Sequence, residues 1–197
     1  MDGYRKGLIL EYLTIGYNIV EALLSIFFGI IAGSPALIGF GMDSIVESLS
    51  EAVLIWRLRQ NKDISKEVEK KIEKKAQRFV SITFFILSAW VLFESVRTLF
   101  QRQEPDASVP GIIIASVSLI LMPTIAFMKR KTGQEIGSRA LIADSKETLA
   151  CAWLSLALLL GLLLNWLFGW WWADPVAGLV IVTYLVKEGF ELWRDSS

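Results

Sequence analysis

The chain has 197 residues, 54% of them hydrophobic, and a mean hydropathy of +0.50. Soluble domains contain roughly 45–50% apolar residues, so this composition indicates a protein whose solvent is lipid. Lys and Arg balance Asp and Glu at 20 each, and the resulting zero net charge gives no general attraction to nucleic acid. One Cys and no His exclude an intrachain disulfide and leave carboxylates and a single thiol for metal or proton chemistry.

Six apolar segments follow one another along the chain, and each approaches or exceeds the roughly 20 residues that cross a bilayer. The sequence therefore predicts an all-α integral membrane protein with six transmembrane helices in a single transmembrane domain, residues 1–197. A signal peptide is the alternative for the first segment, but Glu11 and Glu21 interrupt it and it is longer than a usual signal-peptide core. The predicted spans lie near residues 8–32, 35–56, 79–100, 109–128, 140–168 and 173–193.

Basic residues gather at both chain ends, in the second connection between spans and in the fourth, which includes Lys129, Arg130 and Lys131. The one basic residue in the other three connections is Arg102. Because short loops rich in Lys and Arg stay in the cytoplasm, both termini are predicted to be cytoplasmic. Residues 57–78 mix Lys and Glu at helical spacing, which predicts a charged cytoplasmic helical linker. We expect no separate soluble domain in the chain.

Residues 33–47 and residues 137–151 align without a gap, and both begin with Gly-Ser. The alignment pairs Asp43 with Glu147 and Glu47 with Cys151, so the second and fifth spans each carry a polar pair at i, i+4 spacing. Residues at that spacing share one face of a helix. Two such helices facing each other would form a pocket with four ligands inside the membrane.

Ionisable residues within the spans indicate function, because each costs about 2.5–3.5 kcal/mol at the centre of a membrane helix. Asp43, Glu47 and Glu147 are therefore predicted to be ligands in preference to structural residues. Cys151 is a candidate ligand through its position in the repeat, with the alternative that it packs as a small hydrophobic residue.

Other polar residues near the spans have alternative roles. Glu21 is expected to point at the same interior, and Asp144 to be either a partner of a ligand or an outer ligand. For Glu51 a surface or vestibule role is favoured over a ligand role. Lys146 is expected to neutralise a nearby carboxylate such as Asp144 or Glu21. Asp174, followed by proline, is expected to cap the last helix.

A carboxylate-lined pocket at mid-depth suits divalent cations, and a thiolate favours borderline or soft metals. Four ligands fit the tetrahedral coordination that is usual for Zn²⁺. Carboxylates bind metal only when deprotonated, so metal and protons compete for the site, which is the physical basis of proton-coupled exchange. The sequence contains no nucleophile-base pair and no cofactor motif, so no enzyme is predicted.

Three motifs give the chain a resemblance to the cation diffusion facilitator (cation efflux) family, six-helix transporters that move divalent metals, commonly in exchange for protons. They are Ser34-Pro-Ala-Leu before the acids of the second span, the run from Ser138 to Asp144 before Glu147, and Ala173-Asp-Pro at the last span. The resemblance covers nearly all of the chain. It implies the fold of a transmembrane-only member that lacks the family's C-terminal cytoplasmic domain.

The resemblance also implies a function and a ligand set. The metal ligands would be Asp43, Glu47, Glu147 and Cys151, in a midplane site between the second and fifth helices of a homodimer. Metal/H⁺ antiport would proceed by alternating access, with Zn²⁺ as the first expectation. Members of the family often have His and then Asp on the fifth helix, where this chain has Glu147 and Cys151, so Mn²⁺, Fe²⁺, Co²⁺ and Cd²⁺ stay open.

The remaining expectations concern the membrane in which the protein lies and the alternatives to metal transport. The absence of organelle-targeting features suits a prokaryotic plasma (inner) membrane. The alternative function is that of a membrane protein that does not transport and instead has a structural or regulatory metal site. A carrier of organic cations would line its acids with aromatic side chains, and near the paired acids the sequence has mainly Phe40.

Overall fold

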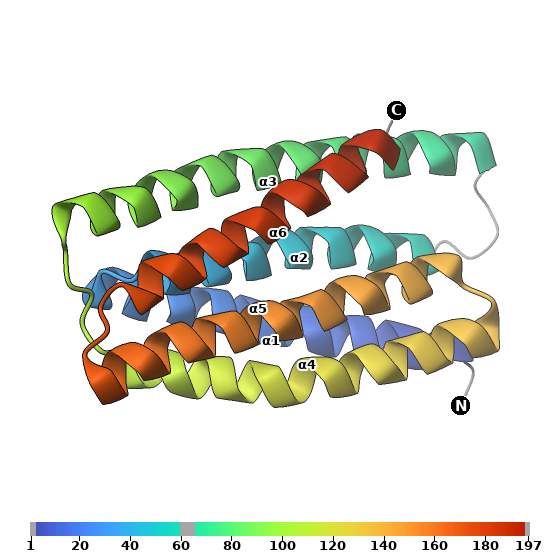
Figure 1. Cartoon of the computed structure of the whole chain (residues 1–197). Helices are drawn as coiled ribbons and strands as arrows, with labels where there is room; N and C mark the ends of the chain where they lie inside the picture. Colours follow the sequence, from blue (N-terminus) through green and yellow to red (C-terminus); the bar gives the residue numbers. More distant parts are fainter. Residues whose placement is uncertain (1–2, 60–65, 196–197) are drawn as a thin grey trace.

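The computed structural model describes residues 3–59 and 66–195, which form six α-helices (Figure 1). The all-α prediction is confirmed. Residues 60–65 of the predicted linker lie outside the described residues, and its remaining part belongs to the end of α2 and the beginning of α3. The helices are α1 (Gly3–Ala32), α2 (Pro35–Arg59), α3 (Lys66–Gln101), α4 (Val109–Ile136), α5 (Arg139–Phe168) and α6 (Ala173–Asp195).

The six helices run along one another with alternating direction, and their packing places four of them around a common interior. α1 packs along α2 and α4, α4 packs along α5, and α2 contacts α5. α3 pairs with α6 on one side of this group, and α6 also contacts α2 and α5 (Figure 1). The start of α1 and the end of α6 point toward the same end of the bundle as the turn between α4 and α5.

Four helical segments are long and apolar enough to cross a membrane: Gly3–Ala32, Ser81–Gln101, Val109–Ile136 and Ala140–Phe168. α2 and α6 carry too many charged residues to meet the same criterion, although both pack within the bundle. The membrane prediction is confirmed as far as these four segments. Six spans with cytoplasmic termini stay a prediction.

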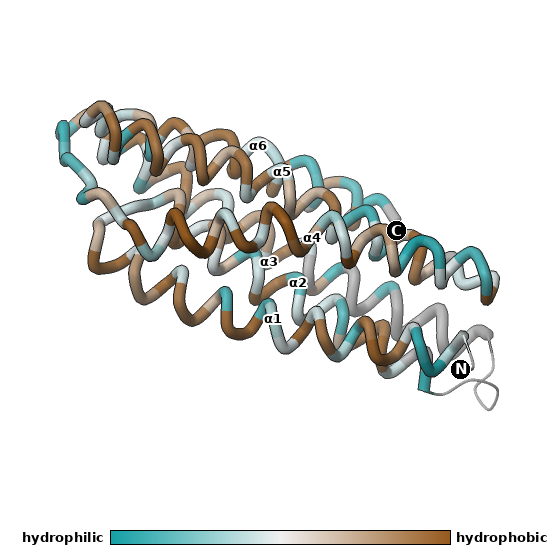
Figure 2. The backbone as a smooth tube through the Cα atoms, turned by 90° about the horizontal axis from the view of Figure 1, so that it is seen from below, coloured by the Kyte–Doolittle hydropathy of each residue, from teal (hydrophilic) through white to brown (hydrophobic). Residues whose placement is uncertain are grey.

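The polar and apolar residues of α1 are distributed in the opposite way to those of a water-soluble helix. The buried face includes Glu11, Asn18 and Glu21, whereas Leu23 and Ile30 are each 66% exposed. Figure 2 shows hydrophobic residues along most of the bundle and hydrophilic residues gathered toward the end where the described termini lie. A polar interior with an apolar exterior is the arrangement that a bilayer selects.

Small residues let α1 and α2 approach closely. A Cβ atom added to Gly29 would lie 2.9 Å from the backbone nitrogen of Ile38, and one added to Gly41 would lie 3.0 Å from the carbonyl oxygen of Ala22. Small residues at such crossings allow van der Waals contact between membrane helices, which have little hydrophobic drive to associate. This contact fixes the acids of α2 against the polar face of α1.

The sequence repeat is also a repeat of local structure. Gly33 and Gly137 both adopt positive φ angles, of 64° and 68°, which glycine tolerates and which ends a helix. The following serines, Ser34 and Ser138, each accept a hydrogen bond from the backbone N–H three residues later and so cap the next helix. α2 and α5 begin at opposite ends of the bundle, so the two repeats are inverted (Figure 1).

Candidate metal site in the bundle interior

Asp43 is the most isolated of the predicted ligands. Its residue is 1% exposed, and its Oδ1 atom is buried without a hydrogen-bond partner. A buried polar atom without a partner costs free energy, so an unpaired carboxylate oxygen in a packed interior calls for an explanation. A bound cation would provide one.

Glu47 and Cys151 connect α2 to α5. Glu47 Oε2 accepts a hydrogen bond of 3.3 Å from Asn18 Nδ2 of α1, and its carboxyl group is close enough to the Cys151 thiol of α5 to interact with it electrostatically. Cys151 is fully buried and free. Three helices therefore meet at the level of Glu47.

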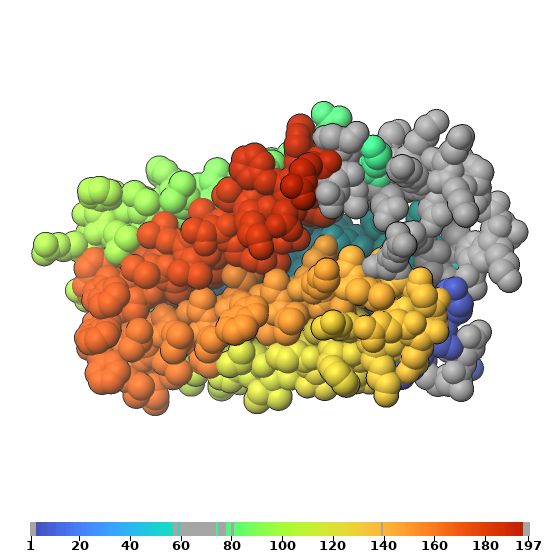
Figure 3. All heavy atoms as spheres, turned by 45° about the vertical axis from the view of Figure 1, so that its right-hand side comes forward, coloured from blue at the N-terminus to red at the C-terminus, as the bar shows by residue number. Residues whose placement is uncertain are grey.

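Glu147 lies on the other side of this region, close enough to Asp144 and to Glu188 of α6 to interact electrostatically with both. Glu188 also interacts with Asp43. Glu47, Glu147 and Glu188 are half-buried, and Figure 3 shows atoms of α2 between α6 and the beginning of α5. Glu188 was not predicted from the sequence as a site residue, although an acid within the last apolar segment indicates a functional role.

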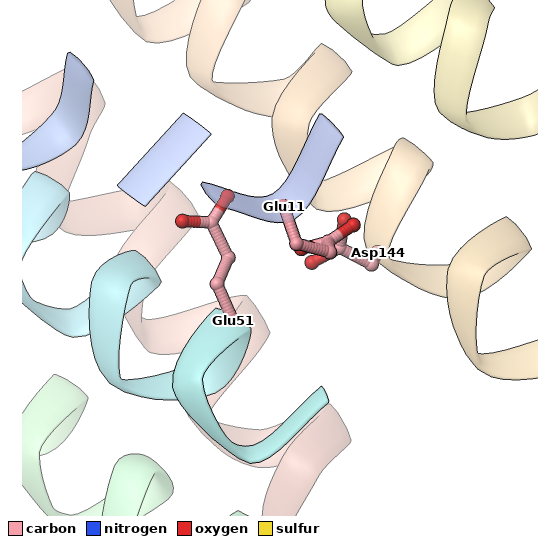
Figure 4. Close-up of side chains that lie close together, drawn as sticks. All are labelled: Glu11, Glu51 and Asp144. Carbon is pink, nitrogen blue, oxygen red and sulfur yellow. The ribbon is translucent and has the colours of Figure 1, made fainter. Parts of the chain in front are cut away.

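The structure does not gather the four predicted ligands into a coordination shell. No three of Asp43, Glu47, Glu147 and Cys151 have ligand atoms within 4.8 Å of one another. Among the described residues, the group that meets this distance consists of three acids one turn nearer the end where α5 begins. These are Glu11 of α1, Glu51 of α2 and Asp144 of α5; Figure 4 shows the carboxyl groups of Glu11 and Asp144 together and that of Glu51 beside them.

The centre of this second group is Lys129. Its Nζ atom lies 2.6 Å from Asp144 Oδ2, 3.0 Å from Glu51 Oε1 and 3.4 Å from Glu11 Oε2, and it donates to Thr148 Oγ1 at 3.3 Å. The sequence prediction placed Lys129 among the basic residues of a cytoplasmic connection. That placement is wrong, because α4 continues to Ile136 and buries Lys129 completely.

The burial of Lys129 also overturns the expectations for Glu51 and Lys146. Glu51 is 2% exposed and paired, so the favoured surface or vestibule role is wrong. Lys146 is exposed, and Lys129 provides the neutralising ammonium that Lys146 was expected to supply. Asp144 is buried and pairs with Lys129, and its predicted role as a partner of a ligand or an outer ligand stays a prediction.

Glu21 and Asp174 both accept hydrogen bonds from neighbouring hydroxyl groups, and the Oδ1 atom of Asp174 is buried without a partner. Glu21 is 2% exposed and accepts hydrogen bonds from Tyr17 at 2.9 Å and Ser44 at 2.8 Å. It points into the interior as expected, but both of its oxygens are already used. Asp174 lies in the first turn of α6, which begins one residue earlier at Ala173, so the prediction that it precedes and caps this helix is wrong. It accepts a hydrogen bond from the Ser34 hydroxyl and so joins the start of α6 to the start of α2.

Comparison with known proteins adds independent information. The family model described as the cation efflux transmembrane domain matches residues 12–197. An uncharacterized transporter of Synechocystis sp., sll1263, is 25% identical over 170 residues, which cover 84% of this chain and 55% of that protein. The cadmium, cobalt and zinc/H(+)-K(+) antiporter of Bacillus subtilis is 21% identical over 197 residues, covering 98% of this chain and 62% of the antiporter.

A vertebrate protein is similar to the same degree. Transmembrane protein 163 of Xenopus laevis is 22% identical over 192 residues, covering 97% of this chain and 67% of its own length. The chain therefore spans between about half and two thirds of the length of these relatives.

Proposed function

Because the chain belongs to the cation efflux family, we propose that it transports divalent metal cations across a membrane, in exchange for protons. This membership agrees with the prediction that the chain is not an enzyme. The observation that carries the proposal is the buried, unpaired Asp43 carboxylate oxygen in a polar interior enclosed by apolar helix faces. A transported cation would provide the missing partner.

The proposed site lies between α2 and α5, with Asp43, Glu47, Glu147 and Cys151 as ligands. Asp43 and Glu147 each lie eight residues after the first residue of their helix, at a depth of about 12 Å from opposite helix ends. Ligands at these depths surround the middle of the bundle. An inverted pair of helices around a midplane site is the general scheme of alternating access.

The present separation of these ligands fits a conformation that does not coordinate metal. Zn²⁺ ligands lie about 2.0–2.3 Å from the metal, so three or four of them must have atoms closer to one another than they are here. Metal binding would draw α2 and α5 together around the ion. Release would separate them again as protons neutralise the carboxylates.

The choice of metal follows from the ligand types. Three carboxylates favour hard cations, and one thiolate shifts the preference toward Zn²⁺, Co²⁺ and Cd²⁺ relative to Mn²⁺ and Fe²⁺. Zn²⁺ is our first expectation, and two Bacillus relatives are named as antiporters of cadmium, cobalt and zinc. We further propose efflux by a homodimer in a prokaryotic plasma membrane.

The test is metal flux into proteoliposomes with an imposed pH gradient. We expect the wild-type chain to move Zn²⁺ in response to the gradient and Asp43→Asn to abolish this flux, because the substitution removes a carboxylate ligand while keeping its size. Glu191→Gln is the matched control, since it neutralises an exposed acid of α6 paired with Lys187. Equal flux in wild type and Asp43→Asn would contradict the site. An absence of flux for every metal from folded protein would favour a structural or regulatory metal site.

A further inference from the structure

Lys129 has the surroundings of a coordinated cation. Its ammonium is 0% exposed and lies within 3.4 Å of four side-chain oxygens from α1, α2 and α5, while Lys129 itself belongs to α4. Lysine is almost never fully buried unless it is paired, because removing its charge from water is expensive. α1, α2 and α5 therefore form a cation-binding shell, and in this conformation the bound cation is the Lys129 ammonium of α4.

The shell lies between the proposed metal site and the end of the bundle where α5 begins. On α2, Glu51 follows Glu47 by one helical turn, and on α5, Asp144 precedes Glu147 by about one turn, so the displacement is about 5 Å. Asn18 Nδ2 lies 3.3 Å from Glu47 Oε2 and 3.4 Å from Glu51 Oε2. One amide thus contacts an acid of each group.

The shell has more anionic capacity than a single ammonium uses. Glu11, Glu51 and Asp144 provide three carboxyl groups within 4.8 Å of one another for one monovalent cation. Glu11 Oε1 is buried without a hydrogen-bond partner. A divalent cation would match the charge better and would satisfy this atom. The Lys129 ammonium sits at the end of a flexible four-carbon chain, so it can leave without unfolding α4.

We infer that Glu11, Glu51 and Asp144 form a second cation station, which Lys129 fills in this conformation and a transported divalent cation fills when Lys129 withdraws. The inference rests on the proposed function for the identity of that cation. Lys129 is then a tethered competitor of the substrate. While its ammonium occupies the station, metal cannot pass between this end of the bundle and the central site.

The binding test compares purified full-length chains in detergent, with Co²⁺ as the probe. We expect Lys129→Met to bind one additional Co²⁺ per chain relative to wild type, and Lys129→Arg, which keeps a tethered cation, to bind none. Glu51→Gln in the Lys129→Met background should remove the additional ion. The matched control is Lys131→Met, which neutralises an exposed lysine two residues later and should leave the stoichiometry unchanged.

Spectroscopy separates the two sites. An ion held by carboxylates gives Co²⁺ d–d bands without the thiolate charge transfer that coordination by Cys151 would produce. If wild type binds no metal and Lys129→Met binds one ion without a sulfur band, the station stands and the central site fails. If Lys129→Met binds no more than wild type, the inference is overturned while the central site stands.

A second variant keeps the inference testable if Lys129→Met does not fold. Lys129→Met with Glu11→Gln removes one acid together with the ammonium and leaves Glu51 and Asp144 to hold the added ion. In liposomes, loss of the tethered competitor should lower the KM for metal supplied at this end and also lower kcat, because metal now dwells at the station. A role confined to folding would reduce the active fraction with KM unchanged, and that result would contradict the inference.

Discussion

Replacing Lys129 by Met should be among the most destabilising single substitutions in the metal-free protein. The side chain keeps its length but loses contacts of 2.6, 3.0 and 3.4 Å to three carboxyl groups that are no more than 8% exposed. Removing one partner of a buried ion pair costs about 3–5 kcal/mol, because it leaves an uncompensated buried charge. We expect a loss of free energy of unfolding in this range.

The measurement is equilibrium unfolding in mixed detergent micelles, followed by the fluorescence of the chain's eight Trp residues. Lys131→Met provides the baseline, since substitutions at exposed positions change stability by about 0.5 kcal/mol or less. Glu94→Gln is a second reference. Its partner Arg97 is 44% exposed at a distance of 3.3 Å, and an exposed pair contributes about 0–1 kcal/mol.

The loss of free energy of unfolding in Lys129→Met decides whether the carboxyl groups around Lys129 are shielded from water or reached by it. A loss below about 1 kcal/mol for Lys129→Met, equal to that of Glu94→Gln, would refute the reasoning, because it would mean that water reaches the carboxyl groups. If the station binds metal once the ammonium is gone, Co²⁺ at a hundredfold excess over its Kd should restore about 2.7 kcal/mol to the variant.

Two further predictions concern the site and the helix packing. Cys151→Ser should leave the chain folded and lower the flux of Cd²⁺ relative to Mn²⁺ in competition assays, because a hard oxygen replaces a soft sulfur, and an unchanged ratio would exclude the thiol as a ligand. Gly41→Ala should cost about 1–3 kcal/mol in the same unfolding assay, because its Cβ would lie 2.8 Å from the Ser25 side chain. Gly16→Ala is the matched control, since a Cβ there meets nothing within 4 Å, and an equal cost at both positions would contradict the packing argument.

The helical fold could be predicted from the sequence because its signals are local. Long apolar segments, the Gly-Ser turns at residues 33–34 and 137–138, and the i, i+4 acids each depend on neighbours within one or two turns. The sequence also predicted that α2 and α5 would be the acidic helices. The inverted relation of the two repeats was not predicted. It follows from the fold, because successive helices run in opposite directions and three connections separate α2 from α5.

The burial of Lys129 was missed because it stands in a run of basic residues, Lys129 to Lys131, next to the end of an apolar segment. Such a run is typical of a cytoplasmic connection, and that pattern fits Arg130 and Lys131, which are exposed. The spacing of residues along the helix did indicate that Lys129 is buried. Met122 and Ala126 lie seven and three residues before Lys129, and all three share the buried face of α4.

The proposed second cation station also explains why α1 and α4 carry polar residues on their buried faces, as do the helices with the proposed ligands. α1 supplies Glu11 and Asn18 to the interior, and α4 supplies Lys129. Asn18 and Lys129 contact acids of α2, and Glu11 contacts Lys129. If the chain transports metal as proposed, an ion that passes from one group to the other would exchange these contacts in turn, with Asn18 bridging Glu47 to Glu51 and Lys129 yielding its place. On this proposal, the Lys129 ammonium would oppose metal entry at a position where metal and ammonium compete for the same carboxylate oxygens.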